Sequence, residues 1–234
     1  MRILVVDNYP QTSLGLIGRA LDEAGATVDL RIMHQGGALP DGPGAHDAMV
    51  LLGGGQNALA DAEHPYLPHL AALTRAFGEA DKAVLGVCLG SQLVARGHGA
   101  ANIIGRPIEF GWKTVRPTAA AASDPVLSAL GDGAPLFHWH YDTFTLPPGA
   151  AHLAASDQTP HQAFRIGRAV YGVQFHFEAD RTLVEAWTSG FADVIAGHTP
   201  DWPARHSVDA ETHGPAADAV GLAIARAWVA QVRV

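Results

Sequence analysis

The chain has 234 residues, 48% of them hydrophobic and 16% charged, so it is long enough to bury a substantial core. Its formal net charge is −8 and no basic run could follow a phosphate backbone, which argues against a nucleic-acid partner. No apolar stretch approaches the roughly 20 residues that cross a bilayer, and the N-terminus enters a strand pattern directly, so we expect a cytoplasmic protein with no membrane partner.

The first hundred residues alternate between short strand-like runs and amphipathic segments. Short apolar or alternating runs predict strands at residues 2–7, 26–32, 48–53 and 83–87. Apolar residues at helical spacing predict helices over residues 12–25 and 66–78. Alternation of strand and helix is typical of a parallel sheet with helices on both sides.

After residue 100 the pattern changes to short alternating segments separated by turns. These segments are "IIGRPIEFGWKTVRP", "PLFHWHYDTF", "AHLAAS", "HQAFRIG" and "RAVYGVQFHFE", and they favour antiparallel additions at the edge of the same sheet. Helices are expected again over about 180–196 and 216–231, separated by a polar loop at 197–217 to which we assign no function. With no linker or repeat, we expect one α/β domain over residues 1–234, a three-layer α/β/α fold with a mostly parallel central sheet.

The only cysteine, Cys88, lies in the glycine-flanked turn "GVCLGSQ" between a predicted strand and a predicted helix. A nucleophile on such a turn projects over the strand ends, where open parallel sheets bind ligands. The start of the helix also favours negative charge on the thiol and on an oxyanion. A buried cysteine in a tight turn is the alternative, but the pattern Gly-x-Cys-x-Gly-x-Gln favours the nucleophile.

A thiol nucleophile needs a base, and the base needs a group that orients it. His176 and Glu178 are two residues apart in "YGVQFHFEAD", so they point the same way if the strand continues that far. The imidazole could then contact Cys88 while the carboxylate fixes its tautomer. Taken alone, these two residues fit better with a surface histidine at a strand end and an acidic residue that opens the next helix, but together with the cysteine turn they favour the catalytic role.

Together, "GVCLGSQ" and "GVQFHFE" resemble the two motifs of the class I (triad) glutamine amidotransferases. The resemblance extends from the first strand to the helix after Glu178 and implies a flavodoxin-like fold. It also implies that Cys88 attacks the side-chain amide of glutamine, giving a γ-glutamyl thioester and ammonia. His176 would act as base and then acid, Glu178 would orient it, and water would release glutamate without any cofactor.

The same resemblance assigns roles to the glycine-rich loop "LGGGQNA" and to the first turn of the helix after Cys88. A backbone amide of Gly54 or Gly55 is expected to pair with that of Leu89 as an oxyanion hole. Gln92 is expected to hold the polar backbone end of the substrate. By themselves, three glycines also fit a flexible loop or a tight turn.

The segment "FHWHYDTF" is similar to one that GMP-synthase-like amidotransferases place beside the glutamine pocket. Asp142 is the candidate for the substrate ammonium group, with His140 and Tyr141 close by. Metal binding by His138 and His140, on one strand face, is an alternative, but no compact third ligand follows them in sequence, so we expect no metal. The remaining alternative is a solvent-exposed strand end whose histidines have no functional role.

The chain departs from the family at Phe177, where proline is usual between the catalytic histidine and glutamate, and phenylalanine leaves that corner freer. It also lacks the phosphate-binding loops of ATP-dependent amide-forming synthases. We therefore expect either that ammonia passes to a separate synthase polypeptide, or that the chain is a stand-alone hydrolase or transferase of γ-glutamyl compounds. A non-catalytic binding protein that acts as part of a complex is the third hypothesis.

Overall fold

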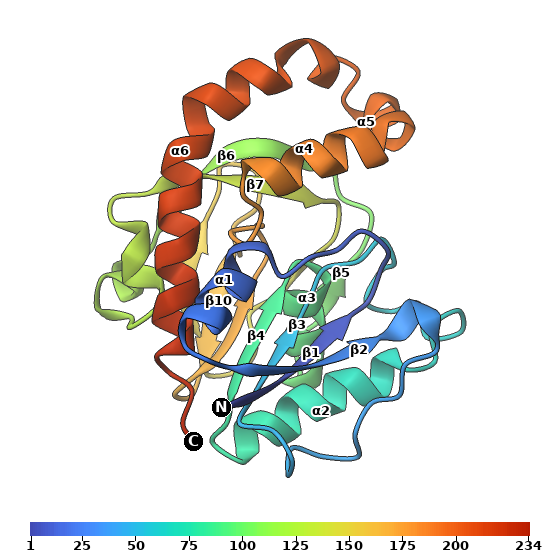
Figure 1. Ribbon diagram of the computed structural model, residues 1–234, viewed down its shortest axis with the longest axis vertical. Helices are drawn as coiled ribbons and strands as arrows, with labels where there is room; N and C mark the ends of the chain where they lie inside the picture. Colours follow the sequence, from blue (N-terminus) through green and yellow to red (C-terminus); the bar gives the residue numbers. More distant parts are fainter.

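The structure, a computed structural model describing residues 1–234, is built on a nine-stranded sheet in the order β2-β1-β3-β4-β11-β10-β9-β6-β7 (Figure 1). The strands of this sheet are β1 (Arg2–Asp7), β2 (Thr27–Ile32), β3 (Ala48–Leu51), β4 (Ala83–Val87), β6 (Glu109–Pro117), β7 (Ala134–His140), β9 (Ala151–Ala155), β10 (Ala163–Ile166) and β11 (Val170–Val173). A separate pair joins β5 (Asn102–Ile103) to β8 (Thr143–Phe144). The first four strands correspond to the four runs predicted from sequence.

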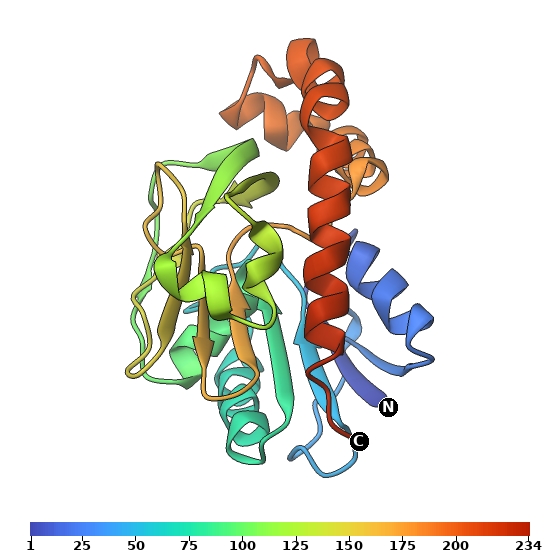
Figure 2. The ribbon, with the colours of Figure 1, turned by 90° about the vertical axis from the view of Figure 1, so that its left-hand side faces the viewer.

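Helices cover both faces of the parallel part of the sheet. The helices are α1 (Gly15–Glu23), α2 (Leu67–Glu79), α3 (Leu89–Gly97), α4 (Arg181–Gly190), α5 (Ala192–His198) and α6 (Trp202–Val229). Side chains alternate across each strand, so Val5 packs in the core with α1 and α6, whereas Leu4 packs in the core with α2 and α3. Figure 2 shows α6 running beside α1 along one side of the molecule. The predicted α/β/α layering with a mostly parallel sheet is confirmed.

Strand β11 differs from the sequence prediction, which grouped it with the antiparallel edge. It pairs antiparallel with β10 but parallel with β4, so it lies in the middle of the sheet. Its four residues are all buried, which a short alternating run does not reveal. The antiparallel additions that the sequence predicted are β10, β9, β6 and β7. The central position of β11 brings its C-terminal end next to that of β4.

The segment predicted as a polar loop over 197–217 is mostly helical, and the prediction was wrong there. Helix α5 ends at His198 and α6 begins at Trp202, continuing through Pro215 to Val229. Proline removes one hydrogen bond from a helix and bends it, and α6 turns over the upper end of the molecule before it descends along the side (Figure 1). None of the helices combines the length with the apolar character needed to cross a bilayer.

The connection from β4 to α3 depends on close backbone packing that only glycine permits. A Cβ atom on Gly90 would lie 2.3 Å from the carbonyl oxygen of Leu51, and one on Gly86 would lie 2.3 Å from the carbonyl oxygen of Gly90. These contacts press the first turn of α3 against β3 and β4. The glycines that flank Cys88 are therefore a packing requirement of the turn.

We predict that Gly90→Ala lowers the free energy of unfolding by about 2–4 kcal/mol, because the new methyl group must displace buried backbone. Chemical denaturation monitored by circular dichroism measures this change. The matched control is Gly197→Ala in α5, where a Cβ meets no atom within 4 Å. Alanine is the better helix former, so the control should gain up to about 1 kcal/mol. Equal stabilities of the two variants would contradict the packing argument.

Candidate active site

Cys88 is the residue between the last residue of β4 and the first residue of α3. Its backbone has φ +53° and ψ −113°, a conformation that non-glycine residues rarely adopt, and its amide donates to the carbonyl oxygen of Val173 on β11 at 2.9 Å. The side chain is 6% exposed and lines a pocket at the carboxyl edge of the sheet. A strained turn held by buried strands on both sides fixes the direction in which the thiol points.

His176 and Glu178 follow the end of β11 and form a short hydrogen bond. The Nδ1 atom of His176 lies 2.6 Å from Oε1 of Glu178, so the imidazole donates to the carboxylate. Strand β11 ends at Val173 and the backbone then bends, but the His176 amide donates to the carbonyl oxygen of Phe137 on β7 at 2.7 Å, in an isolated bridge. The sequence prediction depended on a strand that reaches Glu178, and the structure has none there; the two side chains meet through their hydrogen bond.

The imidazole of His176 and the thiol of Cys88 converge over Gly53. A Cβ atom on Gly53 would lie 3.3 Å from Cε1 of His176 and 4.0 Å from Sγ of Cys88, so a side chain there would crowd both groups. The thiol also lies 3.7 Å from the carbonyl oxygen of Trp139, to which it donates. The structure thus brings together three side chains that are up to 90 residues apart in the sequence.

The charge on His176 is set by its buried surroundings. Burial disfavours the imidazolium, but the adjacent Glu178 carboxylate and the Cys88 thiol outweigh burial and raise the pKa of His176 to about 10. The imidazole is consequently protonated at neutral pH. A protonated imidazole beside a thiol stabilises negative charge on the sulfur.

Phe177 stands where the family usually has proline, and tertiary contacts hold this corner of the backbone. The side chain is 1% exposed and packs in the core. A Cβ atom on Gly221 of α6 would lie 2.1 Å from the carbonyl oxygen of Phe177, and the amide of Leu16 donates to the carbonyl oxygen of Glu178 at 2.9 Å. The corner expected to be freer is therefore clamped between α1 and α6.

The glycine-rich loop after β3 lies beside Cys88. A Cβ atom on Gly54 would lie 2.7 Å from Cδ2 of Leu89, whereas one on Gly55 would lie 2.9 Å from the ring of Tyr9. The amide groups of Gly54 and Leu89 donate to no other group of the chain. Of the two predicted loop glycines, Gly54 is therefore the one nearer to Leu89.

The other predicted binding residues line the same pocket but differ in how free their polar atoms are. The Nε2 atom of Gln92 donates to the carbonyl oxygen of Asp142 at 3.2 Å, and Oδ1 of Asp142 accepts from the amide of Gly105 at 2.8 Å. His140 has Nδ1 3.0 Å from the Asp142 carbonyl oxygen and Nε2 3.2 Å from a carboxylate oxygen of Glu109. Both ring nitrogens of His140 thus face protein groups.

Tyr141 differs from these residues because its hydroxyl is buried without a partner in the chain. Burial raises the pKa of this phenol. Its ring packs edge-on against His198 at the end of α5. The hydroxyl is therefore a donor available to a bound ligand.

Part of the pocket wall is aromatic, a feature not predicted from the sequence. Trp187 lies on α4 and Phe191 directly follows this helix. Their ring centroids are 6.1 and 5.4 Å, respectively, from that of Trp139. Trp187 also lies edge-on to His176, with ring centroids 5.1 Å apart. The cavity has a volume of about 300 Å³. Aromatic residues at helical spacing predict a buried helix face, and nothing in their spacing identifies the cavity that they face.

Known proteins support a relationship over most of the chain. The family described as "Glutamine amidotransferase class-I" matches residues 4–186. The glutamine amidotransferase-like protein YfeJ of Salmonella typhimurium is 31% identical over 188 residues, covering 79% of each chain. One of the subunits of the glutamine-hydrolyzing GMP synthase of Methanosarcina barkeri is 31% identical over 185 residues, covering 78% of this chain and 89% of that one.

A solved structure agrees with these relatives. The glutamine amidotransferase of Methylobacillus flagellatus superposes with a TM-score of 0.85 at 25% identity, covering 99% of this chain and 95% of that one. Against the larger GMP synthase of Phenylobacterium zucineum, 32% identical over 206 residues, the match covers 86% of this chain but only 37% of that protein. The residues after 186, including Phe191 of the aromatic wall, lie outside the family match.

Proposed function

This chain belongs to the class I glutamine amidotransferase family, and from that premise we propose that it releases ammonia from the side-chain amide of glutamine at Cys88. The observation that carries the proposal is the convergence of Cys88, His176 and Glu178 at the carboxyl edge of the sheet, beside a cavity large enough for an amino acid. The chemistry needs a nucleophile in contact with a base, and a third group in contact with the base that orients it.

In the proposed reaction the thiolate of Cys88 attacks the amide carbon, and the carbonyl oxygen becomes an oxyanion. The free amides of Gly54 and Leu89 are the donors that would stabilise it. Because the ring starts protonated, His176 acts as acid before it acts as base, the reverse of the order that the resemblance implied: it gives its proton to the leaving nitrogen, which departs as ammonia and leaves a γ-glutamyl thioester. His176 then takes a proton from water as the water attacks the thioester, the sulfur leaves as the thiolate, and glutamate is released with the starting thiolate and imidazolium restored.

We further propose that Gln92, Tyr141 and Asp142 hold the α-amino and α-carboxylate groups of the substrate. All three line the cavity, and the partnerless hydroxyl of Tyr141 is a ready donor to a carboxylate. His140 would act indirectly, because its Nδ1 atom holds the carbonyl oxygen of Asp142. The ammonia would pass to a separate synthase, by analogy with the Methanosarcina relative, which is itself one subunit of GMP synthase. The whole chain, residues 1–234, would act as one domain.

The test is chemical labelling combined with an ammonia assay. Purified protein is incubated with a glutamine analogue that carries an electrophile in place of the amide, and the labelled peptide is identified by mass spectrometry. We expect one label per chain, on Cys88, and competition by glutamine. Labelling elsewhere, or no labelling together with no ammonia from glutamine, would refute the proposal.

The aromatic wall favours a second candidate, a stand-alone hydrolase or transferase of γ-glutamyl amides. Trp139, Trp187 and Phe191 add an apolar surface that the polar groups of glutamine do not require. An apolar substituent on the amide nitrogen would fit against it. Turnover of γ-glutamyl anilides or alkylamides at a higher kcat/KM than glutamine would support this candidate, whereas the reverse order would support the amidotransferase.

The raised pKa of His176 predicts the pH dependence of the reaction. The imidazolium exists below pH 10 and is lost as the pH rises through about 10, so kcat/KM for glutamine should fall on that alkaline side. Glu178→Gln removes the charge that raises the pKa, so the fall should move to lower pH by about 1–3 units. The pH profile of kcat/KM for both proteins measures this shift.

The same ionisation affects stability with a defined sign. A histidine whose pKa is raised in the folded state stabilises it fully below pH 6.5, and the contribution fades as the pH rises towards 10. Glu178→Gln should therefore destabilise the protein more at pH 6 than at pH 10. Two results together would contradict the ion pair between His176 and Glu178. In the variant, kcat/KM would fall at the same alkaline pH as in the parent, and the loss of stability would be equal at pH 6 and pH 10.

A further inference from the structure

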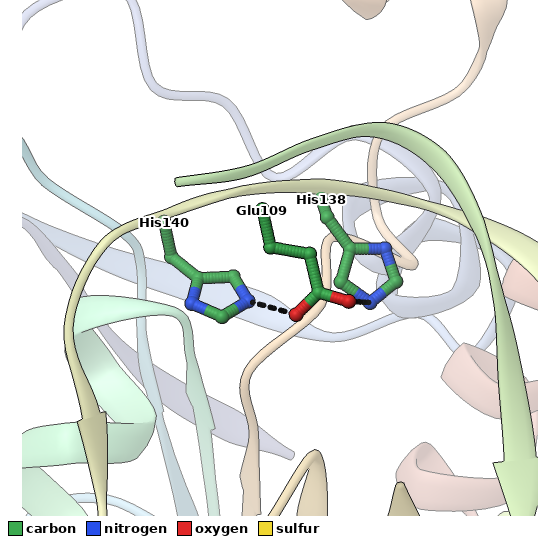
Figure 3. Close-up of side chains that lie close together, drawn as sticks. All are labelled: Glu109, His138 and His140. Carbon is green, nitrogen blue, oxygen red and sulfur yellow. Dashed lines mark ion pairs between the residues drawn. The ribbon is translucent and has the colours of Figure 1, made fainter. Parts of the chain in front are cut away.

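A second cluster of ionisable side chains lies behind the pocket wall, between strands β6 and β7. Glu109 pairs directly with His140 across these antiparallel strands, and Gly111 pairs with His138. Residues two apart share a face, so the carboxylate and both imidazoles project to the same side. Figure 3 shows the carboxylate of Glu109 between the two rings. The pairing register therefore provides the third residue that the sequence after His140 does not contain.

All three side chains are buried, with Glu109 2%, His138 0% and His140 5% exposed. The Nε2 atom of His140 is 3.2 Å from Oε2 of Glu109, and that of His138 is 3.9 Å from Oε1. One ligand atom from each residue lies within 4.8 Å of the others. A buried carboxylate is stabilised when it is paired with a positive charge or coordinates a metal ion.

The far side of each ring fixes its tautomer. Nδ1 of His138 is 2.9 Å from the carbonyl oxygen of Leu136, and Nδ1 of His140 is 3.0 Å from that of Asp142. A carbonyl oxygen only accepts hydrogen bonds, so each Nδ1 carries the hydrogen and each neutral ring presents an Nε2 lone pair to Glu109. Histidines that bind metals have this arrangement, with the second ring nitrogen donating to a backbone carbonyl.

The carboxylate is oriented in the same way. The Nε2 atom of Gln162 donates to Oε2 of Glu109 at 2.9 Å, and Gln162 is itself fully buried. A single proton placed on His140 would join it to Glu109 but would leave Nε2 of His138 buried without a partner. A cation at the centre would satisfy both nitrogens and the carboxylate together.

We propose that Glu109, His138 and His140 form a binding site for a divalent metal ion of the zinc class, separate from the cysteine site. Two imidazoles and one carboxylate are a ligand set found in protein zinc sites. Zinc bonds of about 2.0–2.1 Å in tetrahedral geometry place neighbouring ligand atoms about 3.3 Å apart. The Nε2 atom of His140 is already near this value at 3.2 Å from Oε2 of Glu109, whereas Nε2 of His138 is 3.9 Å from the other oxygen, Oε1, so the His138 ring and the carboxylate must move closer together on binding.

The site would stiffen the wall of the glutamine pocket. His140 connects the two, because its Nδ1 atom holds the carbonyl oxygen of Asp142, which also accepts from Gln92. Binding of metal at Nε2 would fix the His140 ring and hence this contact. No step of the proposed cysteine chemistry passes through the metal, so the two proposals stand or fall separately.

The test uses Cys88→Ser protein, which lacks the thiol as a competing soft ligand. After chelator treatment the protein is titrated with Zn²⁺ by calorimetry and with Co²⁺ by visible absorption. We expect one metal ion per chain, a higher Tm with Zn²⁺, and no comparable effect of Mg²⁺, which prefers oxygen ligands. X-ray absorption of the Co²⁺ protein should show two imidazoles, a readout that needs no further variant.

Glu109→Gln and His138→Gln, made in the same background, should each weaken Zn²⁺ binding by more than about 100-fold, since even changes outside the ligand shell cost 10–100-fold. The matched control is His69→Gln on the exposed surface of α2, which should bind as the parent does. Far-ultraviolet circular dichroism with chelator present checks that the variants are folded. The proposal is overturned if the parent binds no Zn²⁺ at 1:1, if both variants bind as it does, or if the absorption spectrum lacks imidazole ligands.

Discussion

Replacing Cys88 with alanine is expected to lower kcat for ammonia release from glutamine by at least about 10⁴-fold, because no other group can form the thioester. Cys88→Ser should lose nearly as much, since a hydroxyl is a far weaker nucleophile beside an imidazole that is already protonated. The coupled assay with glutamate dehydrogenase measures both rates. The backbone contacts of the turn do not involve the side chain of Cys88, so both variants should keep the Tm of the parent to within a few degrees.

Full activity in Cys88→Ala would end the proposal that this residue is the nucleophile. Labelling by the electrophilic glutamine analogue should disappear in the same variant. The fold offers no second thiol, because Cys88 is the only cysteine in the chain. Residual turnover in the alanine variant therefore cannot come from a neighbouring cysteine.

Replacing His176 with asparagine is expected to lower kcat by about 10²–10⁴-fold, the range for loss of a positioned acid–base group. The variant should also react more slowly with iodoacetamide at pH 7, because the imidazolium that stabilises the thiolate is gone. Steady-state kinetics and the rate of alkylation are independent measures of these two effects.

His69→Asn is the matched control for this prediction, because His69 lies on the exposed surface of α2, away from the pocket. We expect it to retain the parental kcat and the parental alkylation rate. Parental alkylation in His176→Asn would show that the ring does not act on the thiol, even if turnover were lost.

Local patterns in the chain were sufficient to predict the parallel half of the sheet and the turn that carries Cys88. A strand buried on both faces is apolar throughout, and a closely packed strand-to-helix turn needs glycine. Both features can therefore be recognised from a few consecutive residues. The spacing of His176 and Glu178 suggested a base and the group that orients it, and the family resemblance then favoured that interpretation. The structure places the imidazole of His176 near Cys88 and in contact with Glu178.

The helical character of residues 202–217 was missed because the local signals were misleading. Pro215 and the polar residues around it indicate a loop, yet Trp202 is fully buried and its ring packs against Phe110 with centroids 4.9 Å apart. The burial of Trp202 against Phe110, which lies on the distant strand β6, stabilises the first half of α6. A helix anchored by tertiary contacts tolerates an internal proline that an isolated helix would not.

The sequence by itself therefore determined the turn that carries Cys88 and the strands and helices whose apolar residues recur with a regular spacing from end to end. Only the tertiary structure decided the central position of β11, the clamp on the backbone at Phe177, the aromatic wall and the meeting of Glu109 with two histidines. Each of these depends on which distant segments pair and in what register. The spacing of apolar residues indicates which face of a helix or strand is buried. Which distant segment covers that face depends on contacts that form only when long loops close.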